Sequence, residues 1–106
     1  MIKNKTKQNF IQDLYVRIAT SAKSKNKNSY TKLLLSKGRK RIANKVSEES
    51  KELVFDYLKG SKKRVIEETA DLIYHVVLLL YSKKVTIKEI QKELEKRRKV
   101  KNVRQK

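Results

Sequence analysis

Residues that break helices are almost missing from this sequence. Its 106 residues include no proline and only two glycines, Gly38 and Gly60. Because proline and glycine are the strongest local signals for turns, their scarcity argues against a loop-rich β fold and for long helices. Apolar residues make up 38% of the chain, which suffices for one modest core. The sequence therefore predicts an all-α fold in a single domain over 1–106.

Apolar side chains recur at helical spacing in five segments, which predicts a bundle of about five helices. The expected helices cover about 8–22, a short stretch after the cap Ser29, about 39–59, about 62–82, and a last segment that opens at Thr86 and fades near Arg98. Gly38 is expected at a bend, and Gly60 fits as the C′ residue of the helix before it. Thr86 and Glu89 have the spacing of a capping box. The basic tail over 99–106 is expected to fray.

The segment from Leu72 to Tyr81 is apolar around the helix, with His75 as its main interruption. It has about half of the roughly 20 residues that a membrane-spanning helix needs, so no membrane insertion is expected. A helix that is apolar on all sides is normally buried on all sides, and one short chain can hardly surround it. We therefore expect a second copy of the chain to complete the core, which makes the protein a homodimer.

The formal net charge is +18, which by itself favours binding to nucleic acid. The distribution weakens this interpretation, because most of the 11 acidic residues lie in the window 46–75. A basic helical nucleic-acid-binding module is thus the weaker alternative, and a solvated basic surface explains the charge as well. The chain contains no cysteine, which excludes a disulfide framework and a thiolate zinc site and favours a cytoplasmic protein.

Carboxylates interrupt the apolar faces of the two long helices. Ile42, Val46, Leu53 and Tyr57 share one face of the first, and Glu49 falls in the middle of that face with Glu52 at its edge. On the second helix, Glu68 and Asp71 lie along the inward apolar stripe. Burying an ionised carboxylate costs several kcal/mol unless it is paired or bound to a metal.

The connection at Gly60 is short, so the two helices should be antiparallel neighbours. The four carboxylates then come level across the helix interface. Oxygen donors without cysteine describe a site for a hard cation, Mg²⁺ or Mn²⁺ rather than Zn²⁺. The competing interpretation, a solvated face of Glu–Lys pairs, suits Glu48 and Glu67 better than these four residues.

The sequence resembles a known enzyme family in segments that include these carboxylates. The matching residues are Ser29–Thr31, Gly38, Lys45–Glu52 and Glu67–His75. They resemble the phosphoribosyl-ATP pyrophosphatases, within the MazG-like all-α nucleotide pyrophosphatases, whose motif is E-E-x-x-E followed by E-x-x-D. The resemblance covers about 14–98. The chain departs from the family at Ser47 and Lys84, where glycine is common.

This resemblance implies a MazG-like helical fold and the Mg²⁺-dependent hydrolysis of phosphoribosyl-ATP to phosphoribosyl-AMP and pyrophosphate, the second step of histidine biosynthesis. A house-cleaning hydrolase of other nucleoside triphosphates is the alternative within the superfamily. Combined with the helix pattern, the resemblance assigns the metal to Glu49, Glu52, Glu68 and Asp71. Mn²⁺ is expected to substitute for Mg²⁺. Glu48 is expected to be the general base or a ligand of a second ion.

Basic residues around the start of the first long helix are the candidates for binding substrate phosphates. Lys45 is the strongest, because it lies one turn before Glu49. For Lys37, Arg39 and their basic neighbours, a solvated surface is an equally good interpretation. Tyr30 and Thr31 either contact the substrate or cap and pack the short helix. His75 is expected to be a core histidine with satisfied hydrogen bonds.

Overall fold

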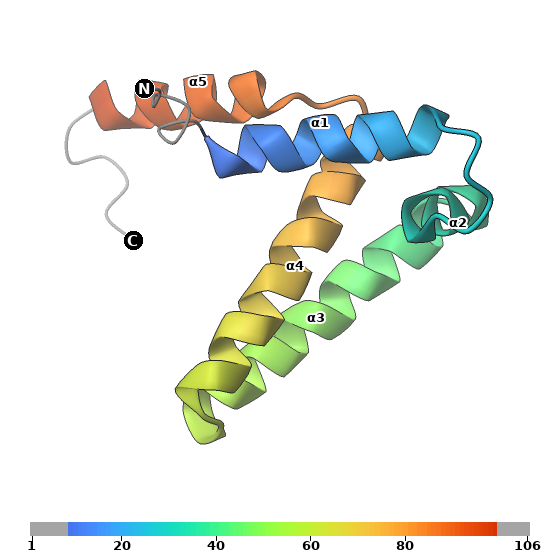
Figure 1. Cartoon of the computed structure of the whole chain (residues 1–106). Coiled ribbons are helices and arrows are strands. Elements are labelled where there is room, and N and C mark those ends of the chain that lie inside the picture. The colour runs from blue at the N-terminus through green and yellow to red at the C-terminus, as the bar shows by residue number, and fades with distance from the viewer. Residues whose placement is uncertain (1–8, 100–106) are drawn as a thin grey trace, which may run out of the picture.

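The computed structural model describes residues 9–99, of which Lys99 is described by its backbone alone, and it places them in five α-helices (Figure 1). The helices are α1 (Phe10–Lys23), α2 (Tyr30–Lys37), α3 (Arg39–Lys59), α4 (Lys62–Ser82) and α5 (Ile87–Lys99). No strand occurs within residues 9–99, so the all-α prediction is confirmed. The predicted start of the first helix at Gln8 and the tail beyond Lys99 lie outside the described residues.

The two longest helices, α3 and α4, form an antiparallel hairpin that projects from a layer made by α1 and α5 (Figure 1). Each has 21 residues, which corresponds to about 31 Å along the helix axis. Ser61 caps α4 by accepting a hydrogen bond from the backbone N–H of Arg64 at 3.1 Å. The predicted antiparallel arrangement around Gly60 is therefore present.

Gly60 was expected at the C′ position, where glycine is favoured because it adopts a left-handed φ. The structure gives a different reason for glycine at this turn. Gly60 is the C-cap residue of α3 and has φ −103°, outside the left-handed region that a C′ glycine adopts. A Cβ atom there would lie 2.4 Å from Asp56 Oδ1 and 2.9 Å from Asp56 Cα. The close approach of Gly60 to Asp56 in the last turn of α3, rather than a special φ angle, therefore selects glycine.

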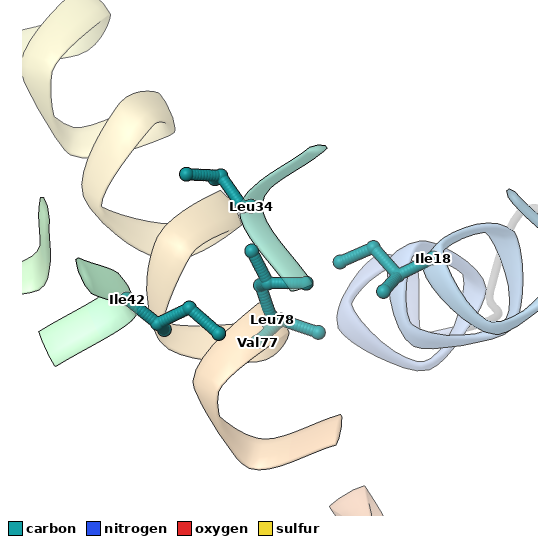
Figure 2. Close-up of a cluster of buried hydrophobic side chains, with 5 residues drawn as sticks. All are labelled: Ile18, Leu34, Ile42, Val77 and Leu78. Carbon is teal, nitrogen blue, oxygen red and sulfur yellow. The ribbon is translucent and has the colours of Figure 1, made fainter. Parts of the chain in front are cut away.

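The buried core lies where α1, α2, α3 and α4 meet (Figure 2). Its central side chains are Ile18, Leu34, Ile42, Val77 and Leu78. Burying an aliphatic side chain of this size contributes about 1.5–3 kcal/mol. These contacts anchor the first turns of α3 and the last turns of α4, and the rest of the hairpin extends away from them.

Local signals at the helix ends match the sequence. Ser29 accepts from the backbone N–H of Lys32, and Thr86 and Glu89 make the reciprocal bonds of a capping box. Gly38 has φ 92° at the predicted bend, a conformation that favours glycine. Lys84 has φ 64°, the left-handed conformation that side chains rarely adopt. No helix of residues 9–99 has the length and hydropathy needed to span a membrane.

Candidate metal centre

Three carboxylates from α3 and α4 converge at the middle of the hairpin. Glu49, Glu68 and Asp71 each offer an oxygen atom that lies within 4.8 Å of the others, and we call them the acidic cluster. Glu49 and Glu68 are only 7% and 4% exposed, whereas Asp71 faces solvent. The cluster lies about two helical turns from the core, since Glu49 follows Ile42 by seven residues on one face of α3.

One oxygen of each buried glutamate lacks a partner. Oε1 of Glu49 and Oε1 of Glu68 are buried and accept no hydrogen bond from any residue in the described part of the chain. Burial of an unpaired charged oxygen is costly, so native proteins normally satisfy such atoms. Two orphaned buried oxygens beside a third carboxylate form a donor set of the kind that Mg²⁺ and Mn²⁺ select. The residues present therefore fit a hard divalent cation.

Two carboxyl groups in and beside the cluster, those of Glu49 and Glu52, have raised pKa values. Burial raises the pKa of Glu49 above its ordinary value, and the neighbouring Glu68 and Asp71 add to this effect while Lys45 and His75 oppose it. The pKa of Glu52 is also raised, first by the adjacent Glu68 carboxyl and then by the negative charge of Glu49. Like charges brought this close disfavour ionisation, and a bound cation removes that penalty.

The structure brings three of the four predicted ligands together. The fourth, Glu52, is exposed at the rim and interacts with Glu68, outside the group of three. A hollow of about 300 Å³ begins at this rim and is lined by Lys51, Glu52, Phe55, Asp56 and Arg64. Glu48 is outside the group of three: its side chain is 53% exposed, and its Oε1 lies 3.3 Å from Lys45 Nζ.

The residues predicted to bind substrate phosphates are more scattered. Lys45 Nζ lies 3.3 Å from Glu48 Oε1 and 3.6 Å from Glu49 Oε2, at the edge of the cluster. Lys37 and Arg39 are exposed at the junction of α2 and α3. Ten residues separate Arg39 from Glu49, which is about 15 Å along the axis of α3. Among these cations only Lys45 lies against the cluster.

Tyr30, Thr31 and His75 form a hydrogen-bonded contact between α2 and α4. Nδ1 of His75 lies 2.8 Å from the carbonyl oxygen of Asp71, which can only accept, so Nδ1 carries a proton. In the neutral ring Nε2 then accepts from the Tyr30 hydroxyl at 3.0 Å. Thr31 is buried, and its hydroxyl bonds to that of Tyr74. His75 is thus a satisfied core histidine as predicted, and Tyr30 and Thr31 pack the short helix onto α4.

Sequence reasoning missed Arg64 and Asp56. Arg64 forms ion pairs with Glu67, Glu68 and Asp56, and Asp56 is buried on α3. The signal was present in the spacing, because Arg64 precedes Glu68 by four residues just as Lys45 precedes Glu49. Such spacing is common on solvated helix surfaces, so it does not by itself indicate a functional residue.

Comparison with known proteins identifies the family. The sequence profile of the phosphoribosyl-ATP pyrophosphohydrolase family matches residues 11–98. The chain belongs to this family. The phosphoribosyl-ATP pyrophosphatase of Sulfolobus acidocaldarius is 41% identical over 91 residues, which cover 86% of this chain and 96% of that protein. The resemblance inferred from the sequence motifs is therefore confirmed.

Two of the relatives that match this chain are longer than it. The histidine biosynthesis bifunctional protein HisIE of Staphylococcus aureus is 40% identical over 87 residues, which cover 82% of this chain. That of Staphylococcus epidermidis is 40% identical over 92 residues. The aligned regions cover 41% and 44% of these two relatives, so the chain spans less than half of their length.

Proposed function

We propose that the chain hydrolyses phosphoribosyl-ATP to phosphoribosyl-AMP and pyrophosphate in histidine biosynthesis. One observation carries the proposal: in a member of the phosphoribosyl-ATP pyrophosphohydrolase family, two buried glutamate oxygens without partners, one from each helix of the hairpin, lie beside a third carboxylate. A purely structural pairing of α3 and α4 has no use for such oxygens, whereas a site for a divalent cation requires them.

In this proposal Glu49, Glu68 and Asp71 bind Mg²⁺, and Glu52 completes the site from the rim. Mn²⁺ has the same preference for oxygen donors and would substitute. When bound, the ion supplies charge neutralisation for phosphate oxygens and a polarised water. The net reaction adds water to the α-phosphorus, breaks its bond to the bridging oxygen and releases pyrophosphate.

The remaining predicted residues keep roles as proposals. Glu48 is exposed beside the cluster, where it would act as general base or as ligand of a second ion. Lys45 is close enough to the cluster to contact a phosphate near the metal. Lys37 and Arg39 would bind the more distant phosphate of an extended substrate. The contacts of Tyr30 and Thr31 support packing more than direct recognition of the substrate.

A homodimer is the second part of the proposal. Large apolar side chains of the outer hairpin are exposed, among them Phe55 at 61% and Leu58 at 68%. A groove of about 400 Å³ between α1, α4 and α5 is lined mainly by apolar residues, including Leu72, Val76 and Leu94. Extended apolar surface of this kind marks an interface, and a second copy of the chain is the proposed cover. A mass by light scattering that stays monomeric at all concentrations would contradict this part.

The activity is tested by measuring pyrophosphate release with Mg²⁺, first from phosphoribosyl-ATP and then from ordinary nucleoside triphosphates. We expect release from phosphoribosyl-ATP alone, its loss on chelation with EDTA, and its recovery with Mg²⁺. Preferential release from ordinary triphosphates would instead support a house-cleaning hydrolase. No turnover together with salt-dependent binding to any duplex would support a nucleic-acid-binding module, which the acidic cluster disfavours by repelling phosphate. A cytoplasmic location follows from the nucleotide substrate and remains part of the proposal.

A further inference from the structure

Two cations flank the acidic cluster in the same way, one from each helix. On α3, Lys45 Nζ lies 3.6 Å from Oε2 of Glu49, four residues later. On α4, Arg64 Nη2 lies 2.5 Å from Oε2 of Glu68, also four residues later. In both glutamates the other oxygen, Oε1, is the buried atom without a partner. Each cation therefore engages one oxygen of a carboxylate and leaves the other one free.

The guanidinium of Arg64 is fixed by more than this one contact. Its Nη1 lies 2.7 Å from Glu67 Oε1, and its Nε lies 3.7 Å from Oδ2 of Asp56, which is buried on the opposite helix. The planar fork of arginine suits several carboxylates at fixed angles, whereas lysine is a point charge. Arg64 thus has a defined orientation even though its side chain is 50% exposed.

We propose that Arg64 is a positioning residue of the metal centre, which fixes Oε2 of Glu68 so that Oε1 is directed at Glu49 and Asp71. The inference rests on the proposed function, because it requires the acidic cluster to bind a divalent cation. A glutamate side chain loses rotamer freedom when it becomes a ligand, and a hydrogen-bonded partner removes part of that cost in advance. Partners that orient ligating carboxylates typically change metal affinity by about 10–100-fold when they are lost.

Charge alone makes the opposite prediction, which makes the proposal testable. Arg64 is a positive charge next to a cation site, so on Coulombic grounds its removal should strengthen cation binding. If Arg64 orients Glu68, its removal should weaken cation binding despite the gain in local negative potential. The sign of the change in affinity therefore separates the two roles.

The experiment measures the Kd of Mn²⁺ by titration calorimetry without substrate, and the rise in melting temperature at saturating Mn²⁺, in the full chain. The variants are Arg64→Met, Arg64→Lys and Glu68→Gln. Lys63→Met is the matched control, because it removes the same charge as Arg64→Met. Lys63 is an exposed neighbour of Arg64 and makes no ion pair within the described residues. We expect the Kd to rise about 10-fold in Arg64→Met, less in Arg64→Lys, and not at all in Lys63→Met.

Two results would overturn the inference, and they differ in whether they also contradict the proposed function. An unchanged or lower Kd in Arg64→Met, with binding lost in Glu68→Gln, contradicts the positioning role and leaves the proposed function in place. Failure of the unaltered chain to bind Mn²⁺ contradicts both. A melt of each metal-free variant by circular dichroism checks folding. Within residues 9–99 only Arg64 makes an ion pair to Glu68, so a folded Arg64→Met decides the question.

Discussion

The two ends of the α3–α4 hairpin are built in different ways. At its base, Ile42 and Leu78 are buried against α1 and α2 in the apolar core. At its tip, apolar side chains of similar size are exposed, and Tyr57 is 76% exposed. The acidic cluster lies between these halves, where burial is still high but apolar contacts within the chain give way to ion pairs. The contrast indicates that packing within the described chain is concentrated at the base, whereas the tip leaves apolar surface exposed.

The largest expected effect is on activity. Asp71→Asn and Glu52→Gln should each reduce pyrophosphate release by at least about 100-fold, since losing a ligand removes several kcal/mol of charge stabilisation. Neither change touches the core at the base, so the helical circular dichroism should be retained. Full activity in either variant would refute the assignment of that residue to the metal centre.

The contrast between base and tip is tested directly by replacing one large apolar side chain in each region with alanine. Leu78 is fully buried, so Leu78→Ala should reduce the free energy of unfolding by about 2–5 kcal/mol. Phe55→Ala removes more atoms but at an exposed position, and in dilute monomeric protein it should change stability by about 0.5 kcal/mol or less. Urea unfolding measures both. A similar loss in the two variants would mean that the tip is as well packed as the base.

Acid should stabilise the cluster when metal is absent. The pKa of Glu49 is raised by burial, so its protonated form is favoured in the folded chain, and its contribution to stability is lost as the pH rises through the folded pKa. Glu49→Gln should therefore melt above the unaltered chain at pH 7 in EDTA, and the difference should shrink as the pH falls toward 4.5. Saturating Mg²⁺ should reverse the order at pH 7. A constant difference across this range would contradict the shift.

A small stabilising effect is expected at Lys84, which follows the last turn of α4 at the base of the hairpin. Its φ of 64° is costly for a side chain but free for glycine. Lys84→Gly should therefore stabilise the chain by up to about 1 kcal/mol, less the entropy that glycine adds to the unfolded state. The resemblance implied that glycine is common at this position, and the left-handed φ of Lys84 is consistent with that expectation. A loss of stability on thermal melting would contradict this explanation.

Periodicity was sufficient to predict the helices and most of the cluster. The 3.6-residue repeat fixes the phase of each helix, so Glu49 could be placed on an apolar face, and the short turn made Glu68 and Asp71 its neighbours across the interface. Tyr57 shares the predicted face with Ile42 but is exposed, because no other helix of the described chain covers the tip. Periodicity gives the direction of a side chain and not whether a partner is present to bury it.

The role of Arg64 could not be predicted in the same way. A cation four residues before a glutamate is found on many solvated helices. What distinguishes Arg64 is that it engages Oε2 of a glutamate whose Oε1 is buried without a partner, and that it also contacts Asp56 on the other helix. These are properties of individual atoms in three dimensions. The same limit applies to Gly60, whose contact with Asp56 depends on the path of the backbone.

The tight connection at Gly60 and Ser61 has a consequence for how this chain tolerates insertions. Each residue advances an α-helix by about 100°, so one extra residue taken up by α4 before Glu68 would rotate Glu68 and every later side chain of α4 relative to the turn. The loop over 24–29 carries no such constraint, because no carboxylate pair depends on its length. Length variation should therefore be tolerated before α2, whereas the length of the turn before α4 is constrained by the alignment of Glu49 with Glu68 and Asp71.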